Sequence, residues 1–176
     1  LILVSYPILG SFSWIIGAVV YKVNYKSKHK NWESDTNKEE PFISILVAAH
    51  NEQDVIGKTL DYLLNDITYK NFEVLVIDDG SSDSTLSILM QYADDYDKLR
   101  IIHIDKNQGK AHALNIGLGF AKGKYIVTND ADTIPSADAL NRYSRYLATN
   151  YVNYIGAVTA NMDVQNRTKI IAKSQT

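Results

Sequence analysis

Residues 42–52 read Phe-Ile-Ser-Ile-Leu-Val-Ala-Ala-His-Asn-Glu, an apolar run of strand length that ends abruptly in polar residues. Short β-rich or apolar runs recur along the chain, and we predict a strand at each of 42–49, 72–77, 99–104, 125–128 and 155–160. The segments between these runs carry apolar residues at helical spacing. Strands that alternate with helices predict an α/β fold built on a mainly parallel sheet with flanking helices.

Polar and acidic residues follow three of these predicted strands. Asn51 and Glu52 follow the first, the pair 78–79 follows the second, and Asp130 and Asp132 follow the fourth. Ligands of open parallel sheets bind beyond the carboxyl ends of the strands. A single aspartate such as Asp78 is more often a cap or turn former, but five clustered carboxylates repel one another unless a cation or ligand compensates. The pattern therefore predicts a ligand site.

Two shorter motifs indicate phosphate chemistry at this site. Asp130-Ala131-Asp132 offers oxygen ligands to a hard divalent metal, which can bridge to a diphosphate. Asp-x-Asp is weak alone and gains weight from its place directly after an apolar strand. Gly109-Lys110 opens a predicted helix, where the lysine could reach a phosphate or base. The alternative for Lys110 is a solvated loop residue.

The helix through Leu86 has a predicted start of its own. Ser81 and Ser82 precede it, and either serine could cap its N-terminus.

The first part of the chain has a different character. Residues 1–21 carry no charge, and a helix of that length extends roughly 30 Å, which predicts a transmembrane helix. The alternative is a cleaved signal peptide, but the run is longer than a typical signal core and ends in lysines. Those lysines make 22–41 a basic juxtamembrane segment and linker, and they predict a cell-membrane protein whose domain, 42–176, is cytoplasmic.

Composition excludes several kinds of protein. The chain has no cysteine, so disulfide frameworks, thiolate zinc sites and cysteine nucleophiles are excluded. After residue 30 there are 14 basic and 20 acidic residues. Nucleic acids bind largely through neutralisation of their phosphates by lysine and arginine, so we expect no nucleic-acid partner.

Four motifs together resemble a known family. Residues 47–52, 76–81, 107–111 and 129–132 occur in the order and rough spacing of family-two glycosyltransferases. The chain looks most similar to the processive membrane enzymes of this family that polymerise N-acetylglucosamine or related sugars, which include poly-N-acetylglucosamine, hyaluronan and chitin synthases. The resemblance runs from about residue 41 to the end of the chain. A proline common in the first motif is replaced by Ala48.

The resemblance implies a GT-A fold, a UDP-sugar donor such as UDP-N-acetylglucosamine, and magnesium or manganese. Glu52 and Asp79 would hold the uracil, Lys110 would approach the base or the diphosphate, Asp130 would hold the ribose, and Asp132 would ligate the metal. A polysaccharide or oligosaccharide acceptor and membrane lipid are the other implied partners. The candidate nucleotide-sugar residues are Ala49, Asn51, Glu52, Asp78, Asp79, Lys110 and Asp130, and the candidate metal ligands are Asp132 and Asp130.

The family also carries an acidic motif that ends in the catalytic base, and a Gln-x-x-Arg-Trp motif further on. Neither occurs in this chain, so we expect the base beyond Thr176. The chain would then be an N-terminal fragment, truncated on the C-terminal side of its GT-A domain. It would hold the donor-binding half of an inverting transferase and be inactive alone.

Two alternatives from other classes remain open at this point. A phospho-receiver domain also gathers acids at strand ends, with Asp130 as the candidate phosphorylation site, but its lysine should follow that aspartate and Lys110 precedes it. A sugar nucleotidyltransferase should carry a glycine-rich basic loop after the first strand, where this chain has 50–52, His-Asn-Glu. Manganese-dependent UDP binding would separate a receiver from the others.

Overall fold

The computed structural model describes residues 2–29, 40–148 and 157–159. The chain divides into two compact units, Leu1–Glu39 and Glu40–Thr176, and each is described by itself.

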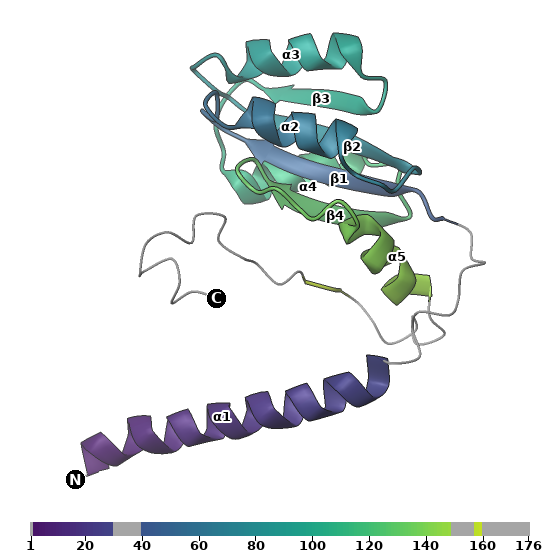
Figure 1. Cartoon of the computed structure of the whole chain (residues 1–176). Helices are drawn as coiled ribbons and strands as arrows, with labels where there is room; N and C mark the ends of the chain where they lie inside the picture. Colours follow the sequence, from purple (N-terminus) through teal and green to yellow (C-terminus); the bar gives the residue numbers. More distant parts are fainter. Residues whose placement is uncertain (1, 30–39, 149–156, 160–176) are drawn as a thin grey trace. The chain divides into compact units, whose positions relative to one another are not determined.

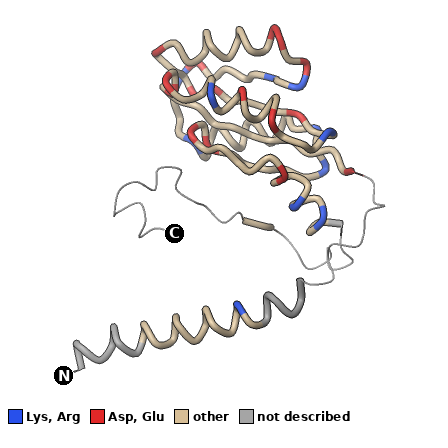
Figure 2. The backbone as a smooth tube through the Cα atoms, viewed as in Figure 1, with Lys and Arg blue, Asp and Glu red and all other residues tan. Residues whose placement is uncertain are grey.

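The first unit contains helix α1, Ile2–His29. Between residues 10 and 23 the large apolar side chains are exposed, as Trp14 at 83% and Tyr21 at 67% illustrate. Lys22 is the one charged residue in that stretch. In Figure 2 the described part of α1 is mostly tan, the colour of residues other than Lys, Arg, Asp and Glu. Across the described ranges, no helix is both long enough and apolar enough to cross a membrane. The transmembrane helix predicted at 1–21 stays a prediction.

The described part of the second unit contains a sheet of four strands that are all parallel, in the order β3-β2-β1-β4 (Figure 1). The predicted α/β fold on a parallel sheet is confirmed. Half of the predicted strand at 155–160 lies outside the described residues, and the described residues 157–159 form no strand. The strands are β1 Ile43–Ala49, β2 Phe72–Asp79, β3 Leu99–Ile104 and β4 Tyr125–Asp130.

Two strands run further than the sequence predicts. β2 continues through Asp79 because Asp78 lies opposite Ala49 of β1 and Asp79 lies opposite Ile104 of β3. β4 continues through Asp130 because this residue lies opposite Ala48 of β1. These acids are thus the last residues of strands and not loop residues. The sheet fixes their backbone, and successive side chains of a strand point to opposite faces of the sheet.

Helices cover both faces of this sheet. Leu60, Leu89 and Leu140 pack from α2, α3 and α5 on one face, and Ala113 packs from α4 on the other. Because β1 and β2 lie in the centre, both of their faces are covered, which explains their nearly continuous apolar sequences. The helices are α2 Ile56–Asn65, α3 Thr85–Asp95, α4 Lys110–Phe120 and α5 Ala139–Ala148.

Helix α4 lies unusually close to the sheet. A Cβ atom on Gly117 would stand 2.5 Å from Ile77 Cδ1, so the site admits no larger residue without a shift. This close packing fixes the position of α4, whose first residue is Lys110.

The start of α3 differs from the prediction. The N-cap residue is Ser84, and its side chain makes no capping bond. Instead Asp83 Oδ1 accepts a hydrogen bond from the Thr85 amide at 2.9 Å, which satisfies one of the free amides of the first turn. The prediction that Ser81 or Ser82 caps this helix is therefore wrong, because both serines bond to groups in or beside the candidate site.

A buried acidic network lies at the amino-terminal edge of the sheet. Glu73 is 4% exposed, and its carboxylate accepts hydrogen bonds from Ser44 Oγ at 2.7 Å, the Lys122 amide at 2.8 Å and Arg100 at 2.9 Å. Burial would raise the pKa of the Glu73 carboxyl, but these hydrogen bonds and the Arg100 charge outweigh it, so the pKa is lowered. Glu73 is therefore a structural anion held by the chain itself.

Candidate functional site

A cavity of about 370 Å³ lies at the carboxyl-terminal edge of the sheet. It collects residues from the ends of β1, β2 and β4 and from the segment that opens α4, which is where parallel sheets bind ligands. Its lining residues are Ala48, Ala49, His50, Glu52, Asp79, Asn107, Gly109, Lys110, Asp130, Ala131 and Asp132.

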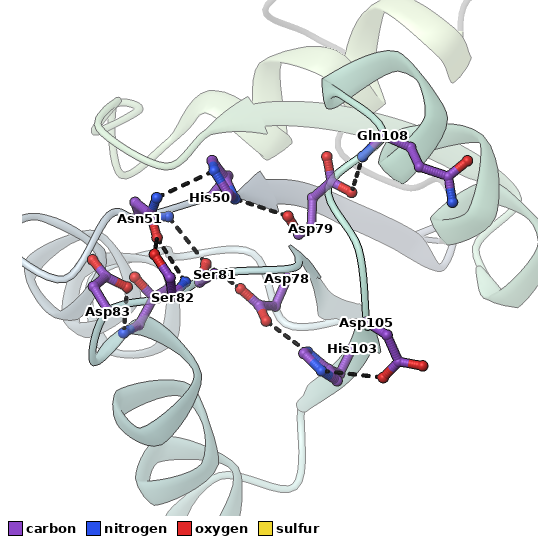
Figure 3. Close-up of polar contacts among 11 residues, drawn as sticks. His50, Asn51, Asp78, Asp79, Ser81, Ser82, Asp83, His103, Asp105 and Gln108 are labelled. Atoms are coloured by element: carbon purple, nitrogen blue, oxygen red, sulfur yellow. Dashed lines mark hydrogen bonds and ion pairs between the residues drawn. The ribbon is translucent and has the colours of Figure 1, made fainter.

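Most of the predicted site residues meet in this cavity. Those that line it are Ala49, Glu52, Asp79, Lys110, Asp130 and Asp132. Asn51 and Asp78 do not line it; their side chains turn toward 81–82 and His103 instead (Figure 3). The sequence did not single out His50, although its place beside Asn51 in the first motif was a usable signal.

The described lining residues have unbalanced charge. Four carboxylates, those of Glu52, Asp79, Asp130 and Asp132, share the cavity with one lysine, Lys110. Lys110 Nζ lies 2.5 Å from Asp130 Oδ1, and both side chains are about half exposed. Clustered like charges cost free energy unless a cation or a hydrogen-bond donor approaches them. The cavity is thus suited to a ligand that brings positive charge or donors.

Asp79 fixes the segment that precedes α4. Its two carboxylate oxygens accept hydrogen bonds from the amides of Gln108 at 3.0 Å and Gly109 at 2.7 Å. The turn is tight: Gly80 has φ +65°, and a Cβ there would stand 2.6 Å from the Asn107 amide nitrogen. A carboxylate oxygen has the capacity for more than one hydrogen bond, so Asp79 can still accept a bond from a ligand.

The loop after β1 is fastened to the turn after β2 (Figure 3). The Asn51 amide donates to Ser81 Oγ at 3.0 Å, and Asn51 Oδ1 accepts from the Ser82 amide at 2.8 Å. Asn51 has φ +56°, a left-handed conformation that asparagine tolerates better than most residues. The Glu52 amide donates to Thr85 Oγ1 at 2.8 Å. Asn51 therefore shapes the loop that presents Glu52.

The position of Glu52 bears on its alternative role as a helix-start carboxylate. Helix α2 begins at Ile56, its N-cap is Val55, and no acidic residue lies in its first turn. The Glu52 backbone carbonyl accepts from the Val55 and Ile56 amides, at 3.1 and 2.9 Å. The side chain is left to line the cavity.

His50 links two of these loops. Its Nδ1 lies 2.8 Å from the Asp79 backbone carbonyl oxygen, and its Nε2 lies 3.2 Å from Asn51 Nδ2 (Figure 3). A carbonyl only accepts and an amide nitrogen only donates, so a proton on Nδ1 satisfies both contacts. The imidazole is thereby oriented at the cavity wall.

Asp78 is occupied by the protein itself. The residue is fully buried, and its carboxylate accepts hydrogen bonds from Ser81 Oγ and, at 2.7 Å, from His103 Nδ1 (Figure 3). These contacts match the turn-forming role that single aspartates often have. Because Asp78 and Asp79 are neighbours on one strand, their side chains point to opposite faces, and only Asp79 of this pair reaches the cavity.

The donor set at the end of β4 fits a divalent metal that is shared with a diphosphate. Among the described residues there is no cluster of three or more His, Cys, Asp or Glu side chains that could hold a metal alone. Asp130 and Asp132 offer two carboxylates, and Mg²⁺ is commonly held by one or two carboxylates together with phosphate oxygens and water. The remaining ligands would come from the nucleotide.

The family model described as "Glycosyl transferase family 2" matches residues 44–172. This chain belongs to glycosyl transferase family 2. The resemblance seen in the sequence motifs is confirmed, and the match favours a glycosyltransferase over a receiver domain or a nucleotidyltransferase.

Curated family-two relatives extend the similarity to nearly the whole chain. The poly-β-1,6-N-acetyl-D-glucosamine synthase of Staphylococcus aureus strain MSSA476 is 34% identical over 178 residues, which cover 99% of this chain and 42% of the relative. The enzyme of the same name from Staphylococcus epidermidis is 32% identical over 186 residues, again 99% of this chain and 42% of the relative. The chain thus spans less than half the length of these relatives.

Solved structures agree with the fold. A mannosyltransferase from Pyrobaculum calidifontis, in complex with GDP-Man and Mn²⁺, superimposes with a TM-score of 0.60 at 27% identity, covering 79% of this chain and 43% of that one. S. aureus TarS in complex with UDP-GlcNAc gives 0.55 at 26% identity, covering 60% and 30%. The predicted GT-A-like fold is confirmed.

Proposed function

We propose that this chain forms the donor-binding half of a metal-dependent, inverting glycosyltransferase that transfers a sugar from UDP-N-acetylglucosamine to a growing polysaccharide. The observation that carries the proposal is the cavity in which four carboxylates face one lysine at the carboxyl edge of the sheet. Two comparisons support the donor: TarS is solved with UDP-GlcNAc, and the curated relatives are named as synthases of poly-N-acetylglucosamine.

In this proposal the nucleotide is recognised by groups from three strand ends. Glu52 and Asp79 hold the uracil, whose single ring N–H donates to one of these carboxylates. Asp130 accepts from a ribose hydroxyl, and Lys110 approaches the base or the diphosphate. The support is that all four side chains line one cavity and that Asp79 is already oriented by two backbone amides.

The metal would be held by Asp132 and Asp130 together with the diphosphate. A bound divalent cation would stabilise the negative charge that builds on the diphosphate as the sugar departs. Relevant support is that Asp130 already pairs with a cation, the Lys110 ammonium, at 2.5 Å. Mn²⁺ is also present in the solved mannosyltransferase complex.

We also propose that residues 1–176 bind the donor without completing transfer. Inverting transfer needs a base within hydrogen-bond reach of the acceptor hydroxyl, and such a base typically contributes 10²–10⁴-fold. Each carboxylate that lines the described cavity already has a proposed role toward nucleotide or metal. We expect no acceptor-dependent release of UDP from UDP-N-acetylglucosamine in manganese, and turnover would show that one of these acids acts as the base.

The decisive test of donor binding is calorimetry of UDP with the 176-residue chain, in manganese and in chelator. We expect UDP to bind more tightly in manganese, and we expect Asp132→Asn to abolish most of that difference. Asp97→Asn, at an exposed aspartate between α3 and β3, is the matched control. Equal UDP affinities for Asp132→Asn and the unaltered chain in manganese would remove Asp132 from the metal site.

Membrane attachment through residues 1–21, with the domain cytoplasmic, is part of the proposal. It is supported by the charge-free sequence of that segment, the exposed apolar side chains of α1 and the lysines that follow. Protease added to intact cells should spare the domain, and permeabilisation should expose it. Digestion of the domain without permeabilisation would show that the domain lies outside the cell, the opposite of the proposed orientation.

A further inference from the structure

A long-range hydrogen bond connects helix α2 to the centre of the Asp-x-Asp motif. Thr59 Oγ1 donates to the Ala131 carbonyl oxygen at 2.7 Å, across 72 residues of sequence. Both residues are buried, Thr59 at 2% and Ala131 at 4% exposure, and Ala131 belongs to the hydrophobic core that α2 also joins. Ala131 is thus held by its side chain in the core and by its carbonyl on Thr59.

This bond is not the one that a helical threonine ordinarily makes. A serine or threonine inside a helix commonly donates its hydroxyl to the carbonyl four residues earlier in the same helix. In α2 the Val55 carbonyl accepts from the Thr59 amide at 3.2 Å, whereas the Thr59 hydroxyl is directed out of the helix to Ala131. The side chain therefore serves the loop after β4 rather than its own helix.

The same loop is fastened from its other side. Asn129 Nδ2 donates to the carbonyl oxygens of Asp130 and Thr133, both at 2.8 Å, and the Thr133 amide donates to the Asp130 carbonyl at 3.1 Å. Asn129 belongs to β4 itself, so Thr59 supplies the contact from a different element. The backbone that carries the Asp130 and Asp132 carboxylates is therefore held by hydrogen bonds from two side chains, those of Asn129 and Thr59.

We propose that Thr59 is a positioning residue for the metal and nucleotide site. Its hydroxyl holds the Ala131 carbonyl, and this fixes the backbone from which the Asp130 and Asp132 carboxylates project into the cavity. Thr59 does not itself line that cavity. The inference rests on the proposed function, because it assigns Thr59 to the support of the proposed metal ligands.

The physical basis is the cost of a buried carbonyl without a donor. If the Thr59 hydroxyl is removed, the Ala131 carbonyl loses its hydrogen bond inside the core, and the loop lowers its free energy by rotating toward another donor or water. Rotation at Ala131 redirects both neighbouring carboxylates. Residues that orient metal ligands from outside typically change metal affinity about 10–100-fold when altered.

The test compares Thr59→Val, which keeps the shape and removes the hydroxyl, with Thr59→Ser, which keeps the hydroxyl. UDP affinity of the 176-residue chain is measured by calorimetry in manganese and in chelator. We expect Thr59→Val to weaken UDP binding in manganese by about tenfold or more and to weaken binding in chelator less, because only the proposed ribose contact of Asp130 is lost there. Thr59→Ser should restore most of the affinity in manganese.

A metal-free measurement provides the second readout. Amide hydrogen exchange at residues 130–133 should be faster in Thr59→Val than in the unaltered chain, and Thr59→Ser should restore the slow exchange. Urea unfolding of each variant establishes that it is folded under the assay conditions. If Thr59→Val is unfolded, Thr59→Ala is measured at lower temperature, and its affinity in manganese decides in the same way.

Thr68→Val is the matched control. Thr68 Oγ1 also donates to an alanine carbonyl, that of Ala137, at 2.9 Å, but the bond is exposed and lies outside the cavity. It should leave UDP affinity in manganese unchanged. An equal loss in Thr68→Val and Thr59→Val would overturn the inference.

The remaining outcomes separate the two proposals. If the unaltered chain binds UDP in a manganese-dependent way and Thr59→Val binds equally well, the role of Thr59 is overturned and the proposed function stands. If the unaltered chain shows no manganese-dependent binding, the proposed function is overturned, and the role of Thr59 with it.

Discussion

The carboxylates at the two edges of the sheet differ in how they are hydrogen-bonded and charge-balanced. At the amino-terminal edge, Glu73 is buried and receives hydrogen bonds from Ser44, Arg100 and the Lys122 amide. At the carboxyl-terminal edge, four carboxylates line the described cavity together with Lys110, which pairs with Asp130. The first arrangement is complete without any ligand. The second leaves negative charge for a bound partner to balance.

Asp78 and Asp79 repeat this contrast within one strand. Asp78 is buried and paired with Ser81 and His103, whereas Asp79 holds two backbone amides and still borders the cavity. Asp78 is fully buried and does not line the cavity, so its carboxylate has no open space beside it. An acid that borders open space with acceptor capacity left is a candidate to bind ligand.

The largest expected effect is at the amino-terminal edge, where the chain itself satisfies Glu73. Glu73→Ala should lower the free energy of unfolding by about 3 kcal/mol, because it removes the acceptor of Ser44 Oγ and of the Lys122 amide and the carboxylate that pairs with Arg100. Urea unfolding measures the loss, with Asp94→Ala on exposed α3 surface as the control. UDP affinity of the folded fraction should stay unchanged. A fall in affinity with unaltered stability would reverse the comparison.

An intermediate effect is expected at the cavity edge. Glu52→Gln should weaken UDP binding by roughly tenfold, the scale of one hydrogen bond to a charged group, and should leave thermal stability unchanged because Glu52 does not cap α2. Calorimetry and thermal melting measure the two quantities. A lower melting temperature with unchanged UDP affinity would assign Glu52 to the structure instead.

The smallest expected effect is the change in stability that protonation of Glu73, at the amino-terminal edge, causes in acid. Because the pKa of Glu73 is lowered from its ordinary value of 4.5, its contribution to stability is present above pH 4.5 and is lost as the pH falls through the lowered value. As the pH falls below 5, the free energy of unfolding of the unaltered chain should therefore decrease more than that of Glu73→Gln. Urea unfolding across that range is the measurement, and identical pH profiles would contradict it.

The sequence predicted much of the fold because its signals were local. Apolar runs located all four described strands, and the strand-end acids located the cavity. The extension of β2 to Asp79 and of β4 to Asp130 was missed, because polar residues at a strand end look like loop residues until their pairing with neighbouring strands is known. The orientation of Asp78 was missed for the same reason.

Contacts between segments that are distant in sequence limit prediction of the site in a different way. Asn51 belongs to a binding motif, yet its bonds reach Ser81 and Ser82, thirty or so residues away. Thr59 sits among apolar helix residues and gives no signal in the sequence, because its partner, Ala131, is 72 residues distant. Such pairings depend on how the elements pack and are not encoded in either segment alone.

The strand order has a consequence for how the protein matures. β4 pairs with β1, the first strand of the sheet, although β2 and β3 lie between them in sequence. Bringing such distant segments together has a large entropic cost, so this pairing is expected late in folding. During synthesis, β1, β2 and β3 leave the ribosome first, and Asp130 and Asp132 complete the pocket only when β4 docks. Nucleotide binding would thus require a chain in which β4 has joined β1.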